Sequence, residues 1–148
     1  MRHVPESVMN MDLENWIVKY EGKTGEKFER DTRFELFFHP DKGFCEIGQG
    51  DNLLIINQLC GDARFWRDLV DNAAKASGIK HCGTWCIRKE ILAYIRLFGY
   101  RIVREHILPD GLKIYYAIRK ETGKPGRAAP CFKYKDTGTQ AYFITWEP

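Results

Sequence analysis

The sequence contains no apolar stretch approaching the ~18 residues that would suggest a membrane span, and no secretory h-region precedes its cysteines. The number of cysteines is odd, and none form a C-x-x-C pair; they stand at positions 45, 60, 82, 86 and 131. Their pattern therefore indicates no disulfide framework. We expect a soluble, cytoplasmic protein whose thiols are reduced.

Neither sign of charge is in large excess. The formal net charge is +3, which is too small by itself to imply a polyanionic partner. Of the 148 residues, 44% are hydrophobic and 14% are aromatic, which argues against disorder over most of the length. A chain of this size folds as one domain that buries roughly 68–70% of the surface exposed when it is unfolded.

The spacing of apolar residues predicts a mixed α/β order. Leu13, Trp16, Ile17 and Tyr20 recur at helical spacing. Short apolar segments at 34–39, 44–47 and 53–57, separated by turn residues, predict an antiparallel three-stranded meander. The elements expected after the meander are a helix from 63 or 64 to 77, a strand over 80–87, a helix over 91–98 and a hairpin formed by 100–108 and 112–120.

Residues 121–130 differ in composition from the segments before them. They are rich in Gly, Pro and charge, which predicts a linker or mobile loop. Apolar character returns at 131–134 and 140–146, where we expect a terminal hairpin. We therefore divide the chain into a domain over 1–120 and a basic extension over 121–148.

The predicted order of elements, from about Asp12 to Lys120, resembles the GCN5-related N-acetyltransferase (GNAT) family with its first strand missing or reduced. In that family the last strand of the meander splays from the next parallel strand, and the pantetheine arm of acetyl-CoA lies in the opening. The pyrophosphate sits on the N-terminus of the following helix, in a frame written Q/R-x-x-G-x-G/A. Gln58, Gly61 and Ala63 occupy this frame.

The resemblance implies a set of cofactor contacts. Backbone groups of Leu53, Leu54 and Ile55 would contact pantetheine, and the turn would hold the pyrophosphate through residues Gln58, Cys60, Gly61, Asp62 and Ala63. Asp62 departs from the family pattern, because its carboxylate repels phosphate. It is also a good N-cap, and a capping side chain occupies the N–H groups that a phosphate would use.

The candidate catalytic residues are Tyr94 and Glu46. The family often places a tyrosine general acid four residues before the glycine of a G-F/Y pair, here Gly99-Tyr100; Ile95 occupies that position, and Tyr94 lies one residue earlier. One residue is ~100° of rotation on a helix, so Tyr94 would point away from the family's direction unless the helix is shifted. Glu46 is a candidate base acting through water, and His39 is another.

The resemblance implies an acyl-CoA-dependent N-acyltransferase that moves an acetyl group from acetyl-CoA to an amine of a small molecule or protein. The alternative is a catalytically silent GNAT-like interaction protein, similar to small bacteriophage proteins of this kind, acting in the host cytoplasm or the virion. A third possibility is nucleic-acid binding through residues 119–135, where lysines and arginines are interleaved with Phe132 and Tyr134. We expect no metal site, because Cys82 and Cys86 on one strand would lie roughly 13 Å apart.

Overall fold

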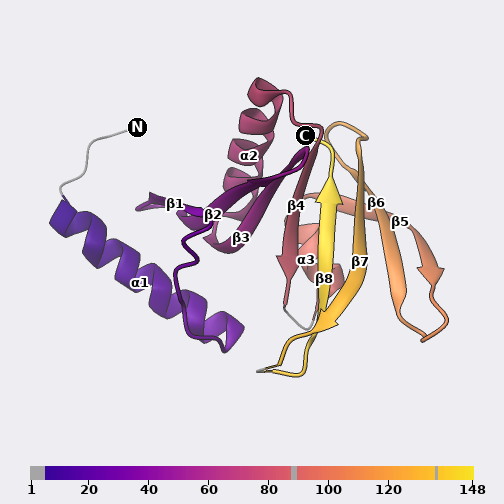
Figure 1. The fold of residues 1–148 in the computed structure, drawn as a ribbon, viewed down its shortest axis with the longest axis horizontal. Coiled ribbons are helices and arrows are strands. Elements are labelled where there is room, and N and C mark those ends of the chain that lie inside the picture. Colours follow the sequence, from indigo (N-terminus) through magenta and orange to yellow (C-terminus); the bar gives the residue numbers. More distant parts are fainter. Residues whose placement is uncertain (1–5, 88–89, 136) are drawn as a thin grey trace.

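The computed structural model describes residues 6–87, 90–135 and 137–148 (Figure 1). The helices are α1 (Glu6–Thr24), α2 (Ala63–Ser77) and α3 (Ile91–Leu97). The first four strands are β1 (Glu35–His39), β2 (Gly43–Gly50), β3 (Leu53–Gly61) and β4 (His81–Cys86). The last four are β5 (Tyr100–Ile107), β6 (Lys113–Arg119), β7 (Pro125–Lys133) and β8 (Gln140–Trp146).

The strands form one sheet in the order β1-β2-β3-β4-β8-β7-β6-β5. The β3–β4 pair is parallel and is joined through α2, whereas the other neighbouring strands are antiparallel. The expected mixed α/β order is confirmed, with its helix, antiparallel meander, helix, parallel strand, helix and hairpin. Among the described residues, no helix is long and apolar enough to cross a membrane.

The C-terminal segment lies inside the sheet. The loop expected over 121–130 is wrong from Pro125 onward, where β7 begins, and β8 lies between β4 and β7 (Figure 1). Proline is compatible with these positions because Pro125 opens its strand and Pro130 adjoins a register shift. Residues 121–148 therefore supply two strands to the same sheet as residues 1–120.

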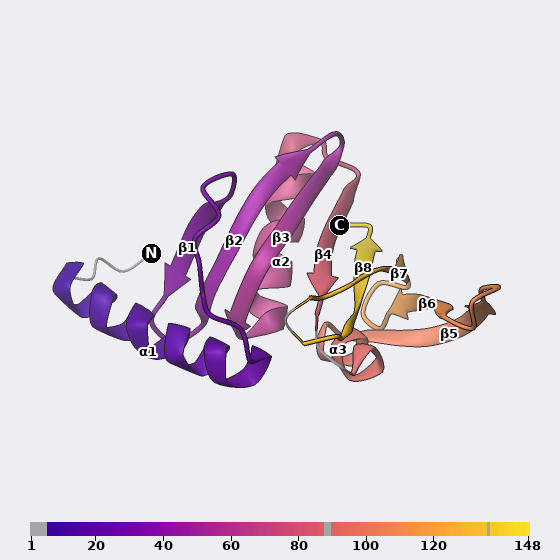
Figure 2. The same cartoon turned by 60° about the horizontal axis from the view of Figure 1, so that its bottom comes forward.

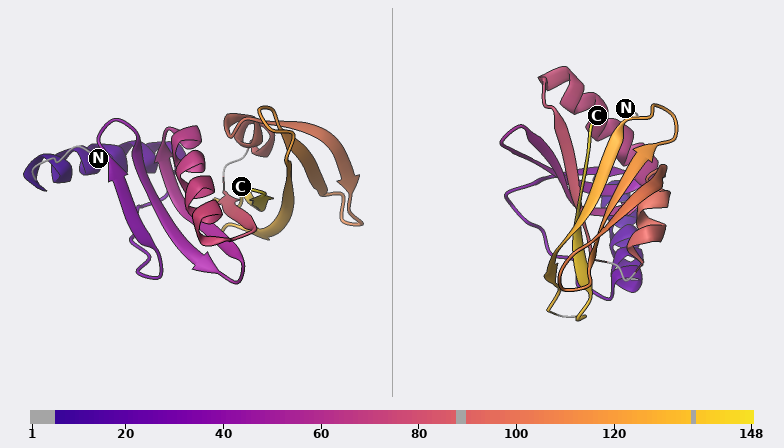
Figure 3. Two further views of the ribbon diagram at one scale, coloured as in Figure 1. Left: turned by 90° about the horizontal axis from the view of Figure 1, so that it is seen from above. Right: turned by 90° about the vertical axis from the view of Figure 1, so that its right-hand side faces the viewer.

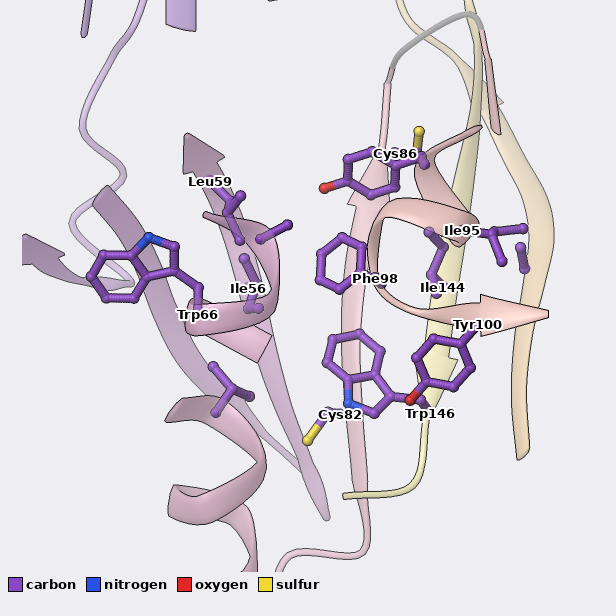
Figure 4. Packing of buried hydrophobic residues seen from close by; sticks show 14 of the residues in the cluster. Ile56, Leu59, Trp66, Cys82, Cys86, Ile95, Phe98, Tyr100, Ile144 and Trp146 are labelled. Atoms are coloured by element: carbon purple, nitrogen blue, oxygen red, sulfur yellow. The ribbon is translucent and has the colours of Figure 1, made fainter. Parts of the chain in front are cut away.

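Helices cover parts of both faces of the sheet (Figures 2 and 3). The α1 helix contacts β2 and β3, whereas α2 contacts β3 and β4 from the other face and α3 contacts β5. The larger core lies beneath α2 and α3; in Figure 4, Trp66 lies on its β3 side, and Trp146 and Tyr100 lie on the opposite side. A smaller core of Tyr20 and Phe44 lies beneath α1.

Candidate functional site: a cleft between diverging strands

The parallel strands β3 and β4 separate partway along their length. Their pairing runs from Leu53 with His81 to Ile56 with Thr84 and then stops, although β3 continues to Gly61 and β4 to Cys86. The expected opening between these strands is therefore present. It begins where β3 changes from apolar residues to Asn57.

A β-bulge explains the separation. The register between β2 and β3 shifts between Cys45 and Ile47, so that two residues of β3, Asn57 and Gln58, lie opposite Glu46 alone. An extra residue on one strand bends that strand and increases its local twist. The bulge thus turns the end of β3 away from β4 and directs both amide side chains toward the carboxylate of Glu46.

Glu46 is fully buried, and its carboxylate connects the bulge to the segment after α1. Its Oε1 atom accepts hydrogen bonds from the side-chain amides of Asn57, at 3.1 Å, and Gln58. Its Oε2 atom accepts from the backbone N–H of Asp31, at 3.0 Å, and from the guanidinium of Arg30. A carboxylate has about four acceptor positions, and all four are filled. Glu46 therefore holds the 29–33 segment against the bulge, and its role as a base stays a prediction that this hydrogen bonding does not favour.

The cleft has a volume of about 610 Å³, within the range of small-molecule sites. Its walls come from the end of β3, from β4, from the polar segment after α1, and from residues on and after β7. Tyr94 on α3 lines the cleft and packs against Phe98, with ring centroids 5.1 Å apart. Tyr94 and Ile95 both belong to the large core, but only Tyr94 also lines the cleft, so α3 presents an edge of Tyr94 to it.

Much of the cleft wall consists of charged side chains in ion pairs and of tyrosine hydroxyls. The guanidinium of Arg33 donates to Asp31 and lowers the pKa of that carboxyl to about 2. The Tyr134 hydroxyl donates to the carboxylate of Glu26. Burial, and then the nearby Glu26 charge, raise the pKa of Tyr20 well above its ordinary value. Tyr20 therefore contributes a neutral hydroxyl to the cleft at physiological pH.

The turn expected to hold a pyrophosphate is filled by protein groups. The Asp62 carboxylate caps α2 by accepting from the N–H of Phe65, at 3.1 Å. The carbonyl of Lys42, in the β1–β2 turn, accepts from the N–H of Asp62 at 3.0 Å and from the indole Nε1–H of Trp66 at 2.8 Å. A Cβ atom at Gly61 would lie 2.0 Å from that same carbonyl oxygen, so this glycine is required by the neighbouring turn.

The other residues of the expected phosphate frame are also engaged elsewhere. Cys60 and Ala63 are buried in the two cores, and Gln58 donates to Glu46 and to the carbonyl of Glu29. No loop separates the two elements, because β3 ends at Gly61 and α2 begins at Ala63. The groups of this turn are therefore engaged within the protein, and the phosphate contacts over 58–63 stay a prediction that this arrangement does not favour.

The residues expected to contact pantetheine do not line the cleft. Leu53, Leu54 and Ile55 are paired with β4, which occupies the backbone edge that a ligand would use. The part of β3 that faces the cleft is Asn57 to Leu59. The sequence carries a signal for this difference. Two adjacent polar residues, Asn57 and Gln58, follow the apolar residues 53–56 and interrupt the strand pattern where the bulge lies.

The basic segment 119–135 does not form one surface. The Arg119 guanidinium is largely buried, where it donates to Asp71, Asp68 and Glu121. Phe132 and Tyr134 belong to the wall of the cleft. Only some of the basic side chains in 119–135 are therefore available to bind a nucleic acid.

No protein-family model and no curated protein matches the chain. Among solved structures it is similar to a crystal structure from Agrobacterium tumefaciens described as a "putative acetyltransferase". The two share 12% identity with a TM-score of 0.41, over 100% of this chain and 97% of that one.

Proposed function

We propose that this protein transfers an acyl group from a thioester to an amine, and that the cleft between β3 and β4 is the reaction site. The observation that carries the proposal is that β3 and β4 separate after Ile56 and Thr84, which leaves the edge of β3 facing a cleft that contains Tyr94. An extended ligand arm can bind such an edge as an added strand does, through main-chain hydrogen bonds.

The thioester supplies an activated carbonyl carbon. The amine attacks this carbon, the C–S bond breaks, and the amine proton passes to water. Backbone N–H groups of β3 beyond Ile56 stabilise the oxygen as negative charge develops. The Tyr94 hydroxyl donates its proton to the departing thiolate and recovers a proton from water. Glu46 is a positioning residue, because it fixes the bulge from which those N–H groups project.

The donor is recognised through its pantetheine arm rather than through its nucleotide. This follows because Asp62, Lys42 and Trp66 already use the groups at the start of α2 that a pyrophosphate would need. Acetyl-CoA and S-acetylpantetheine, which lacks the nucleotide, should therefore be used about equally well. The acceptor is an amine on a small molecule or protein.

The test is thiol release from each donor, measured with a panel of amines. We expect kcat/KM values for the two donors to agree within about tenfold, a difference of ~1.4 kcal/mol. A loss of about a hundredfold or more with S-acetylpantetheine would show that the nucleotide is bound specifically. No turnover of either donor would overturn the reaction.

Tyr94→Phe tests the proton donor. Its kcat should fall about 10²- to 10⁴-fold with little change in KM. Tyr115→Phe is the matched control, because Tyr115 does not line this cleft and its variant should retain full activity.

The occupied N-terminus of α2 specifically favours the second candidate, a GNAT-like binding protein without catalysis. Calorimetric titration with S-acetylpantetheine separates the two functions. Heat of binding without turnover in any amine assay would establish the binding protein, whereas turnover would exclude it.

A further inference from the structure

The C-terminal half of the sheet presents one face without a helix. α3 packs on the other face of this half, where Ala117, Ala128 and Ile144 are buried in the core. Within the described part of the chain, α1 contacts β2 and β3, and no helix is drawn over β6 and β7 in Figure 1. We call the uncovered surface of β4, β8, β7, β6 and β5 the open face.

Strand register places a row of side chains straight across the open face. The pairing runs from β4 to β5 through adjacent partners, which are Gly83, Thr145, Arg127, Tyr116 and Arg104. Alternation along each strand adds Trp85 and Phe143 on the same face, and Arg101 and Ile118 at the outer strands. These side chains come from five separate segments of the sequence.

The composition of the open face is aromatic and basic. It carries three arginines, at 101, 104 and 127, which are exposed, and three aromatic rings, from Trp85, Phe143 and Tyr116, which are half-buried. None of the residues that the register places on this face is acidic. A face with charge of one sign attracts a polyanion.

The rings are fixed in stacked arrangements. Trp85 and Phe143 stack with centroids 5.0 Å apart and planes inclined by 21°. The guanidinium of Arg104 lies over the ring of Tyr116 at 4.2 Å. Cross-strand neighbours are held by the sheet, so these groups lose little conformational freedom when they bind a flat ligand.

We propose that the open face binds single-stranded nucleic acid, with bases stacking on Trp85, Phe143 and Tyr116 and phosphates paired with Arg101, Arg104 and Arg127. A sheet surface bearing aromatic residues accommodates two or three unpaired bases, and arginines beside it track the backbone. Five strands about 4.8 Å apart span roughly 19 Å, enough for such a segment. A second copy of this chain fits less well, because its open face would bring arginines against arginines. The proposal does not depend on acyl transfer.

The experiment is fluorescence anisotropy of the full chain with labelled oligothymidylate of about 20 nucleotides. Binding should weaken as salt rises from about 50 to 200 mM, with a slope of log K against log salt of about −2 for three phosphate contacts. The triple variant Arg101→Ala/Arg104→Ala/Arg127→Ala should abolish most of this slope. The charge-matched control Arg96→Ala/Lys75→Ala/Lys80→Ala changes exposed residues elsewhere and should bind as the unmodified protein does.

Stacking is tested separately by Phe143→Leu and Tyr116→Leu, which lie outside the cleft and should each weaken binding about 5- to 150-fold. Duplex DNA of the same length should compete poorly, because its bases are already stacked. Equal losses in the two triple variants, equal competition by duplex, or no binding at low salt would each overturn the proposal. If a leucine variant fails to fold, the variant that lacks the three exposed arginines still tests the proposal.

Discussion

The side-chain amide of Gln58 donates a hydrogen bond to the carboxylate of Glu46 across the bulge between β3 and β2. The same carboxylate binds Arg30 and the backbone of Asp31, so it joins the bulge to the segment that forms the opposite wall of the cleft. The shape of the cleft therefore depends on the buried carboxylate of Glu46.

Glu46→Ala should lower the free energy of unfolding by about 2–4 kcal/mol, because it leaves half-buried donors of Asn57 and Gln58 unsatisfied and removes the partner of Arg30. Urea denaturation measures the change. Arg33→Ala is the control, since it breaks an exposed ion pair and should change stability by no more than about 0.5 kcal/mol. Similar small effects in both variants would contradict the role given to Glu46.

Asp62 should stabilise α2 in a pH-dependent way. The N–H of Phe65, and then Lys42, keep the pKa of Asp62 below its ordinary value, so the folded state favours the ionised form. The resulting stability is present above the unfolded-state pKa of about 3.9 and is lost as pH falls through the lower folded-state value. Asp62→Ala should cost about 1 kcal/mol at neutral pH.

Thermal unfolding of the unmodified protein and the Asp62→Asn variant, followed between pH 7 and pH 2, checks the charge contribution. The difference between them should shrink below a pH of about 4. A difference that stays constant over this range would show that the cap acts only through its hydrogen bond.

A chain ending at Lys120 should lack a cooperative thermal transition. Removal of 121–148 takes both β8 and β7 from between β4 and β6 and deletes Ile144 and Trp146 from the core. It also removes the indole N–H that donates to the buried Asp71 at 2.7 Å. Near-ultraviolet circular dichroism during heating provides the measurement. A chain ending at Trp146 is the control and should unfold cooperatively, and cooperative unfolding of the shorter chain would support a separate domain over 1–120.

One of the five thiols should react with a membrane-impermeant thiol reagent in the folded state. Cys131 is exposed, whereas Cys45, Cys60, Cys82 and Cys86 are buried. Burial also raises the pKa of Cys82 to about 12, which suppresses its thiolate. Mass spectrometry should show one adduct on the native chain, five after unfolding, and none on native Cys131→Ser. Rapid modification of a second cysteine would indicate an opening of the core.

Much of the secondary structure follows from the sequence, because helix and strand periodicity are properties of neighbouring residues. The stripe of Trp66, Val70 and Ala74 predicts α2, and the apolar segments before it predict the meander. The part of β7 from Pro125 to Pro130 escaped prediction because its prolines and glycine outweighed its pairing with β6 and β8, which is a non-local interaction. The end of β7 forms the expected terminal hairpin with β8.

The sequence by itself determined the order of elements from α1 to β6. The opening after β3 was expected only from the family resemblance, and helical rotation alone placed Tyr94 away from it. Only the tertiary structure decided that the Lys42 carbonyl occupies the start of α2, that Arg119 is buried against Asp71, and that Arg127 and Tyr116 lie side by side. The physical reason is that the neighbours of a side chain within a sheet are set by strand order and register. Those pairings join residues far apart in the chain, so local spacing does not reveal them.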